Sequence, residues 1–401
     1  MDGIFSKYER DELNKITAKS ILEKLMDIRQ KINAEFIARR LVWELIQNAK
    51  DNVSLCNEQG ERVDIKIEIK DDEFIFSHNK GYFTNEHIRG LIRKYSSSDK
   101  NRDADNLGKS YKTTGRFGTG FMTTHLLSEK VKIISNYKND NQTFNPFSFW
   151  LNRSGKGEKE IIQGINEAFE EAETSILSCS SLHLDKEILQ TSFIYPLSEK
   201  NKSLAEIAVD EVRKGIAYTL INVPEINSVA LCDDSVSKEI YSIEEKETNS
   251  YQGNEILSYN LLINGKITKN YYITIENTNV RIMLPILFSS GNYSVLHLDD
   301  SIPKLHLDFP MIGTEDLNLP FIINSSLFEP TEKRDGISLI DDDDNEFSRL
   351  NCALMLEAAE LYKVLLSYIE QKTSWNDLYN LARIKNPKRH SWIDFDWFKK
   401  M

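Results

Sequence analysis

Residues 44–51 read Glu-Leu-Ile-Gln-Asn-Ala-Lys-Asp, and this stretch decides how the rest of the chain is interpreted. A helix turns by about 100° per residue, so Glu44, Asn48 and Asp51 share one helical face. An amide oxygen can bind the hard Mg²⁺ ion and a carboxylate can orient a water molecule, so this pattern suits a magnesium–nucleotide site. The same three side chains are also ordinary on the solvated face of an amphipathic helix.

The composition is that of a globular protein large enough for two domains. The chain has 401 residues, of which 40% are hydrophobic and 28% are charged, and this length suffices for two cores plus an appendage. The net charge is −12 and the isoelectric point is about 5.3. Such an acidic chain is not expected to bind a phosphate backbone as its main task, although a local basic patch is compatible with it.

Cysteine usage and hydropathy predict a cytoplasmic protein without a membrane segment. The cysteines lie far apart, at positions 56, 179, 232 and 352, and lack metal-ligand spacing. We interpret them as reduced thiols, with disulfides as the alternative only in an exported chain. The first residues contain no apolar signal region, and no apolar run is long enough to span a bilayer.

Apolar periodicity predicts an α+β domain over residues 1–202, with helices covering one face of a mixed sheet. The expected helices are one or two within 8–34, one around Glu44, and those at 86–93 and 121–127. The expected strands are 63–69, 73–77, 130–135 and 191–197. Residues 95–114 are polar, and a loop of this length inside a domain is usually functional or disordered.

The remaining residues predict a second α/β domain at 203–345 and a helical segment at 346–401. The expected helices are 203–221 and 347–371. The expected strands are 228–232, 258–263 and 271–276. Asn264-Gly265 separates the last two strands, and this dipeptide is a strong hairpin signal.

A second polar segment follows the strand at 73–77. His78, Asn79 and Gly81 stand at the strand end, where a glycine lets the backbone approach a flat ligand while a side chain reads its edge. The alternative is a plain turn between a strand and a helix, because asparagine and glycine form turns in any case.

A glycine cluster at 115, 118 and 120 precedes the helix at 121–127. Free N–H groups at a helix start bind phosphate, and glycine lets the anion come close. The cluster is not a dinucleotide fingerprint, because its spacing differs and it follows a polar loop. Just before the cluster, Gly108-Lys109-Ser110 resembles the end of a P-loop, but Asp103 occupies the position of that motif's first glycine and no strand precedes it, so we reject a P-loop.

Together the three segments resemble the GHKL ATPases, the superfamily of gyrase, the ninety-kilodalton heat-shock chaperone, histidine kinases and MutL. Residues 43–51 are similar to the N box in its sacsin-like and chaperone-like form, 76–83 to the adenine-binding box, and 115–121 to the second glycine box. Residues 95–114 take the place of the ATP lid. The resemblance implies a Bergerat-type ATP-binding α/β sandwich, followed by a transducer-like α/β domain and a C-terminal helical segment.

The resemblance implies a role for each site residue. Glu44 would be the general base that polarises the attacking water, Asn48 would hold Mg²⁺, and Asp51 would lie near the phosphates or their water shell. Thr191 would support adenine recognition. Backbone N–H groups for the phosphates would come from Gly115, Phe117, Gly118, Gly120 and Phe121.

The adenine-binding box departs from its relatives. Many of them carry Asp-Asn-Gly, whereas this chain has His78 at the aspartate position and Lys80 in place of the first glycine. A neutral histidine accepts a hydrogen bond in only one tautomer. The base is therefore read by His78, by Asn79 or by a nearby water molecule, and a guanine-preferring or degenerate site stays open.

In relatives, a basic residue of the following domain completes the γ-phosphate site. The segment Phe328–Gly336 resembles the corresponding stretch of sacsin-like proteins, so Arg334 or Lys333 would sense ATP and couple hydrolysis to domain rotation. The alternative is a surface ion pair with Asp335 or Glu332.

The family resemblance implies an ATPase that hydrolyses ATP slowly and undergoes lid closure and clamp-like dimerisation. A nucleotide-dependent homodimer would use segment 8–34, and a protein partner or client would link the ATPase to a chaperone-like or bacterial antiviral defence system. The alternative is a nucleotide-gated interaction module that binds ATP or ADP with little hydrolysis. Histidine kinase and topoisomerase activities are disfavoured, because neither a phospho-accepting helix pair nor a tyrosine-bearing catalytic domain is evident. Nucleic acid is not indicated by the charge, and no membrane is expected.

Overall fold

The protein is described from a computed structural model. It covers residues 7–30, 33–56, 60–93, 120–139, 141, 143–185, 188–233, 236–331, 333–340, 345–371 and 374–400.

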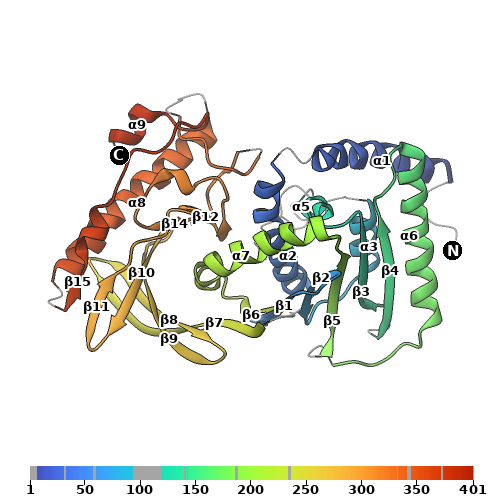
Figure 1. The fold of residues 1–401 in the computed structure, drawn as a ribbon, viewed down its shortest axis with the longest axis horizontal. Coiled ribbons are helices and arrows are strands. Elements are labelled where there is room, and N and C mark those ends of the chain that lie inside the picture. Colours follow the sequence, from blue (N-terminus) through green and yellow to red (C-terminus); the bar gives the residue numbers. More distant parts are fainter. Residues whose placement is uncertain are drawn as a thin grey trace. The chain divides into compact units, whose positions relative to one another are not determined.

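The chain divides into two compact units (Figure 1). The first comprises Met1–Arg213 and Glu225–Glu239, and the second comprises Lys214–Pro224 and Ile240–Met401. Helix α7 (Glu199–Asn222) and strand β7 (Val236–Tyr251) supply residues to both units.

The first unit is built around a mixed sheet with the strand order β6-β1-β2-β5-β3-β4. Strands β1 and β6 are parallel, and the other neighbours are antiparallel. The mixture of helices and strands confirms the predicted α+β class. Besides residues of α7 and β7, its elements are α1 (Lys7–Arg29), α2 (Ala34–Cys56), β1 (Val63–Ile69), β2 (Glu73–Asn79), α3 (Asn85–Arg93), α5 (Gly120–Thr123), the 3₁₀ helix η2 (Thr124–Leu126), β3 (Lys130–Lys138), β4 (Phe144–Asn152), α6 (Glu158–Ser178), β5 (Gln190–Pro196) and β6 (Ile226–Asp233).

Strand β1 and helix α2 follow directly from their sequence periods. In β1 every second residue is buried, starting at Val63 and ending at Ile69, and the residues between are half-buried. This is the two-residue period of a strand with one face on the core. Helix α2 buries an apolar stripe against β1 and α5, which leaves its polar stripe for other contacts. Arg39 on α2 also makes two hydrogen bonds, of 2.7 and 3.0 Å, with the Glu211 carboxylate on α7.

The second unit contains a sheet with the strand order β13-β12-β14-β10-β9-β8-β7; β11 pairs with β10, and β15 pairs with β11. The predicted hairpin at Asn264-Gly265 is confirmed: both residues have positive φ, 54° and 72°, and Ile263 pairs with Lys266. The elements are β8 (Asn254–Ile263), β9 (Lys266–Glu276), β10 (Arg281–Ser289), β11 (Asn292–Val295), β12 (Leu305–Leu307), β13 (Phe309–Pro310), the 3₁₀ helix η4 (Glu315–Leu317), β14 (Ile322–Asn324), α8 (Glu346–Glu370), β15 (Trp375–Asn376), the 3₁₀ helix η5 (Leu378–Ala382) and α9 (Phe395–Lys400).

This division into units differs from the three segments predicted from the sequence. Helix α8, which was expected to open a separate C-terminal segment, packs on β9 and β10. Its apolar stripe needs a partner surface, and its buried side chains share one core with strands of the second unit. Residues 346–401 therefore belong to the second unit.

Within the parts of the chain that the structure describes, no helix combines the length and apolarity required to cross a membrane.

Candidate functional site

A polar stripe on α2 forms the centre of the candidate site. Glu44, Asn48 and Asn52 follow one another at intervals of four residues, so they lie on one face of the helix. At about 1.5 Å of rise per residue, the stripe is about 12 Å long from the first residue to the last. The Glu44 side chain is 14% exposed, and Asn48 between the two ends is exposed.

One end of the stripe meets the start of α5. A Cβ atom added at Gly120 would lie 1.9 Å from Glu44 Oε2, far closer than two such atoms can approach. A side chain here would therefore displace the Glu44 carboxylate, and with glycine the backbone lies directly against that carboxylate. Arg40 Nη2 lies 3.7 Å from the other carboxylate oxygen of Glu44. The structure thus brings together the predicted carboxylate and the last glycine of the predicted cluster.

The other end of the stripe meets the turn after β2. A Cβ atom added at Gly81 would lie 2.2 Å from Asn52 Oδ1 and 2.4 Å from His78 Cε1. Asn52 Nδ2 also donates a hydrogen bond of 3.1 Å to the Tyr82 carbonyl. A side chain at position 81 would displace Asn52 or His78, so the glycine allows these two side chains of α2 and β2 to lie close to the Gly81 backbone.

The hydrogen bond of His78 determines its tautomer. Its Nδ1 lies 3.1 Å from the Asn79 carbonyl oxygen, and a carbonyl can only accept, so Nδ1 carries the proton. Nε2 then presents a lone pair, and no residue in the described part of the chain hydrogen-bonds to it. Burial lowers the pKa of His78 to about 4, so the ring is neutral at pH 7. His78 is thus a hydrogen-bond acceptor.

Thr191 lies opposite His78 in the pairing of β2 with β5. Its hydroxyl is fully buried, 2.7 Å from Ser135 Oγ and 3.5 Å from the Gly81 carbonyl oxygen. The two hydroxyls link β5 and β3 and place a polar group beside the Gly81 backbone. The predicted residues Thr191, His78 and Gly81 therefore form one cluster.

The Asn79 amide is engaged by a neighbouring strand. Its Oδ1 accepts a hydrogen bond of 2.8 Å from the Asp64 backbone N–H, and its Nδ2 donates one of 3.1 Å to Asp64 Oδ2. Asp64 in turn accepts from Asn227 and Ser228 on β6. Of the two side chains predicted to read a base, His78 is the one that keeps an available acceptor.

A row of aromatic rings connects the two ends of the site through the sheet. Phe121, the residue after Gly120, contacts Phe193 with ring centroids 5.5 Å apart. Phe193 contacts Phe76 at 6.4 Å, and Phe76 contacts His78 at 6.5 Å. Each aromatic pair contributes about 0.5–1.5 kcal/mol beyond its buried area. The row therefore fixes the start of α5 relative to the end of β2.

Other predicted residues are buried or lie outside the described residues. Asp51 is buried, and its Oδ1 lies 3.5 Å from Nζ of Lys50, which is buried as well. Gly115, Phe117 and Gly118 lie outside the described residues, as does the predicted lid at 95–114. Sequence reasoning missed Asn52, although its position four residues after Asn48 was a usable signal.

The predicted basic residues of the second unit lie in a tight turn. Thr331 donates its backbone N–H to the Gly336 carbonyl at 2.9 Å, and Arg334 donates its own to the Thr331 carbonyl at 2.8 Å. The Thr331 hydroxyl also donates to Asp335 Oδ1 at 2.7 Å. Arg334 has a φ of 54°, a left-handed conformation that is uncommon outside glycine and is enriched at functional sites. Lys333 beside it is exposed.

Comparison with known proteins assigns no family to the chain. A search against protein-family models finds no match, and a search of curated proteins likewise finds none. No group of three or more histidine, cysteine, aspartate or glutamate side chains in the described residues is arranged to hold a metal ion.

The buried histidines of the first unit predict a loss of stability in mild acid. Burial lowers the pKa of His78 to about 4, and burial together with the charge of Arg153 lowers that of His125 to about 3. An unfolded histidine protonates near pH 6.5. Below that value the unfolded chain binds protons that the folded unit excludes, so stability falls as the pH is lowered.

We expect urea midpoints to fall from pH 7 to pH 5.5, a window in which ordinary carboxylates stay ionised. His125→Asn should make this slope shallower whatever its effect at pH 7. A midpoint that is constant over the window would contradict the burial of neutral histidines.

Proposed function

We propose that the protein binds ATP with Mg²⁺ along the α2 stripe and hydrolyses it slowly, as a member of the GHKL ATPases. The observation that carries the proposal is the pair of contacts at the ends of the stripe. Glu44 lies against Gly120 at one end, and Asn52 and His78 lie against Gly81 at the other. A nucleotide needs a site with two different ends. One end hydrogen-bonds to the edge of the flat base, and the other is open to the anionic phosphate chain.

The base would bind at the His78 end. Nε2 of the neutral ring accepts a hydrogen bond, and adenine offers an exocyclic amino group as donor where guanine has a carbonyl. The buried Thr191 hydroxyl lies beside the Gly81 backbone and would support recognition of the same edge of the base. Adenine is therefore the base that this end of the site favours.

The phosphates would bind at the Glu44 end. Glu44 would accept a proton from the attacking water as general base, and Asn48 would hold Mg²⁺, which neutralises charge on the phosphates. Backbone N–H groups of the glycine segment, including those of Gly120 and Phe121, would donate to phosphate oxygens. Asp51, which is buried on the same helix, would lie near the phosphates or their water shell.

The second unit would couple hydrolysis to movement. Arg334, or Lys333 beside it, would sense the γ-phosphate, as the resemblance to the GHKL ATPases implies. Lid closure over the nucleotide and homodimerisation through the helical segment 8–34 would follow. Such a cytoplasmic clamp would act on a protein client in a chaperone-like or antiviral defence system.

A second candidate function is a nucleotide-gated interaction module with little or no hydrolysis. The observation that favours it is the Arg40–Glu44 ion pair of 3.7 Å. An ion pair holds the carboxylate toward Arg40 and away from an attacking water molecule, so nucleotide binding could proceed while turnover stays low. Phosphate release in the presence of Mg²⁺ separates the two functions.

Calorimetric titration with ATP, ADP and GTP, with and without Mg²⁺, tests the proposal and is followed by phosphate-release measurements. We expect ATP and ADP to bind, GTP to bind more weakly, and Mg²⁺ to strengthen ATP binding. Absence of binding by all three nucleotides would overturn the proposal.

Asn48→Ala should remove most of the magnesium dependence of ATP binding, because the variant lacks the proposed ligand oxygen. Removing a group that only hydrogen-bonds to a metal ligand typically lowers metal affinity by about 10–100-fold. Removing the ligand itself should therefore lower the magnesium enhancement of ATP binding by an amount at the upper end of that range. Calorimetry with and without Mg²⁺ measures the effect. Asn270→Ala, at an exposed position of β9, is the matched control. Equal magnesium enhancement in Asn48→Ala and the parent would exclude Asn48 as the ligand.

A further inference from the structure

A basic segment near the end of the chain stands out against the acidic whole. Residues 383–390 read Arg-Ile-Lys-Asn-Pro-Lys-Arg-His, with four lysine or arginine residues and no carboxylate, in a chain of net charge −12. The segment follows η5 and has no helical or strand structure of its own. Its length and charge make it a concentrated positive surface in the second unit.

The basic segment is fixed to the unit by hydrogen bonds. Asn318 Nδ2 donates to the Asn386 carbonyl at 2.9 Å, and the Lys388 backbone N–H donates to the Asp316 carbonyl at 3.1 Å. Just before the segment, the Tyr362 hydroxyl donates to the Leu381 carbonyl at 2.7 Å. Because the backbone is held in place, its side chains lose less conformational freedom when they bind a partner.

Three cations of the segment remain available. Arg383, Lys385 and Arg389 are exposed, and none forms an ion pair with any residue that the structure describes. Lys388 differs, because its Nζ lies 2.8 Å from Asp316 Oδ1. Available cations next to a neutralised one indicate a surface for an anionic partner rather than an internal ion-pair network.

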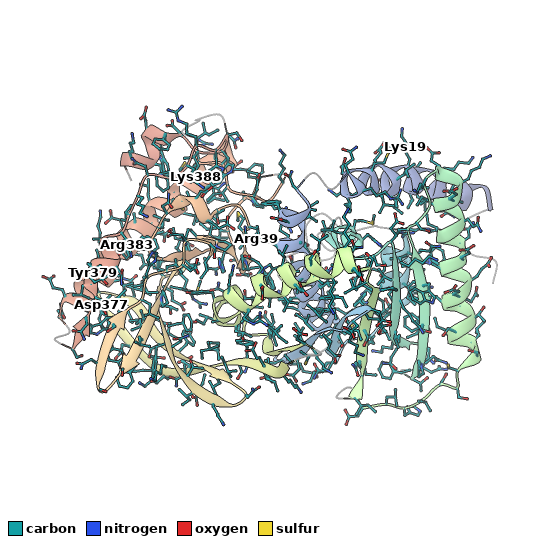
Figure 2. The ribbon with its side chains drawn as sticks, in the orientation of Figure 1. Lys19, Arg39, Asp377, Tyr379, Arg383 and Lys388 are labelled. Atoms are coloured by element: carbon teal, nitrogen blue, oxygen red, sulfur yellow. The ribbon has the colours of Figure 1, made fainter. Side chains whose placement is uncertain are left out.

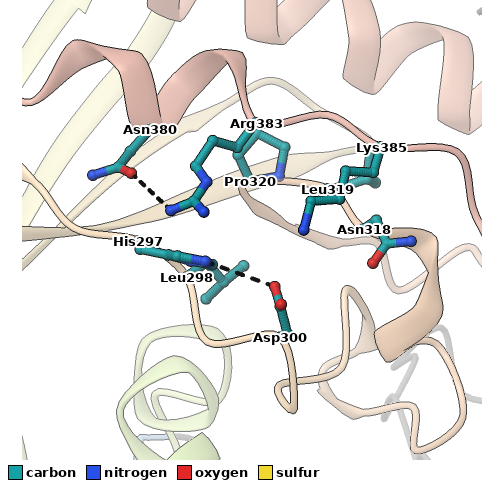
Figure 3. Close-up of a pocket in the computed structure, with 9 residues that line it drawn as sticks. All are labelled: His297, Leu298, Asp300, Asn318, Leu319, Pro320, Asn380, Arg383 and Lys385. Atoms are coloured by element: carbon teal, nitrogen blue, oxygen red, sulfur yellow. Dashed lines mark hydrogen bonds and ion pairs between the residues drawn. The ribbon is translucent and has the colours of Figure 1, made fainter.

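Two of these cations line a shallow pocket (Figure 3). Arg383 and Lys385 share it with His297 and Asn318, which supply ring and amide donors. Arg383 Nη1 is 3.5 Å from Asn380 Oδ1, a contact to a neutral group that leaves the charge uncompensated. The pocket also contains Asp300, whose Oδ1 lies 3.8 Å from His297 Nε2. Two cationic side chains against one carboxylate suit a phosphate group.

An exposed aromatic ring lies beside the basic segment. Tyr379 is 67% exposed, and Ile384 between the two pocket cations is 55% exposed. Figure 2 shows Tyr379, Arg383 and Lys388 following one another along the same side of the second unit. Proteins bind single strands with two components: exposed aromatic rings stack on unpaired bases, and neighbouring cations bind the phosphates.

We propose that residues 379–389 bind single-stranded nucleic acid, with phosphates on Arg383, Lys385 and Arg389 and a base stacked on Tyr379. A single strand is favoured over a duplex because the segment offers no helix or two-stranded ribbon to enter a major groove. It is favoured over an acidic peptide because a peptide carboxylate does not use the exposed ring. The proposal is independent of ATP binding.

Fluorescence anisotropy with a labelled single-stranded DNA oligonucleotide, measured without ATP over a range of salt concentrations, tests the proposal. Arg383→Gln combined with Lys385→Gln should weaken binding and reduce the salt slope by about 1.4, since each contact to a single strand contributes about 0.7. Lys266→Gln combined with Lys269→Gln removes the same charge from an exposed part of β9 and should leave binding close to that of the parent.

Tyr379→Ala separates stacking from charge. It should weaken single-strand binding by about tenfold and leave any weak duplex binding unchanged. Equal loss in the two charge variants would overturn the proposal in favour of non-specific attraction. Binding of polyglutamate or of anionic lipid vesicles in place of the oligonucleotide would also overturn the proposal. The same holds if the protein does not bind the oligonucleotide at all.

Discussion

Replacing Glu44 by glutamine should abolish ATP turnover and leave ATP binding close to that of the parent. The amide has nearly the same shape as the carboxylate, so it still fits against Gly120. It cannot accept a proton from water, and loss of a general base typically costs about 10²–10⁴-fold in rate. The ion pair with Arg40 is also lost, but a partly exposed pair of 3.7 Å contributes little to stability.

Phosphate release and calorimetry measure the two halves of this prediction separately. Glu35→Gln makes the same chemical change at an exposed position in the first turn of α2 and should behave like the parent. Parent-like turnover in Glu44→Gln would remove Glu44 as the base. If the parent itself shows no turnover and both proteins bind ATP equally, the nucleotide-gated module becomes the supported function.

Local patterns were sufficient to predict several elements. Strand β1 matches the predicted range of 63–69, because strict alternation leaves only one way to bury its apolar face. The hairpin at 264–265 was predictable because asparagine and glycine tolerate the two positive φ angles that it requires. Such features depend on neighbours in the sequence and little on the rest of the fold.

Two strands with internal prolines were not predictable in this way. Proline cannot donate to a neighbouring strand, so it argues against a strand assignment. Strand β4 tolerates Pro146 because it lies at the edge of its sheet. Strand β10 tolerates Pro285 because β14 pairs only with residues 281–283 and β11 only with 286–289 on that side. Both reasons depend on strand order, which no local pattern contains.

In the candidate site, too, local features were predictable and contacts between elements were not. The shared face of Glu44 and Asn48 follows from helical spacing alone. The engagement of Asn79 by Asp64 depends on the pairing of β1 with β2, and the position of Asn52 depends on the approach of Gly81. Sequence spacing therefore finds residues that share an element, whereas contacts between elements decide which of them remain available.

Gly120→Ala should abolish turnover and weaken ATP binding without unfolding the protein. The new methyl group would lie 1.9 Å from Glu44 Oε2, so the carboxylate must move by more than an ångström, and a displacement of that size can cost about 10²-fold in rate. Alanine is favoured over glycine in a helix by about 1 kcal/mol, so α5 itself should be preserved. Gly157→Ala, where a Cβ atom meets nothing within 4 Å, is the matched control, and thermal unfolding of each variant checks the fold.

A double-substitution cycle attributes the effect of Gly120→Ala to Glu44. Adding Glu44→Ala to Gly120→Ala removes the colliding carboxylate, so ATP binding should recover while turnover stays absent. Residues in direct contact typically show coupling energies of about 0.5–3 kcal/mol, and calorimetry resolves a binding difference of that size. Additive losses of binding in the double variant would mean that Gly120 and Glu44 act independently. Parent-like turnover in Gly120→Ala would show that the reacting groups lie elsewhere, because no arrangement that uses this carboxylate in its present position can also accommodate the methyl group.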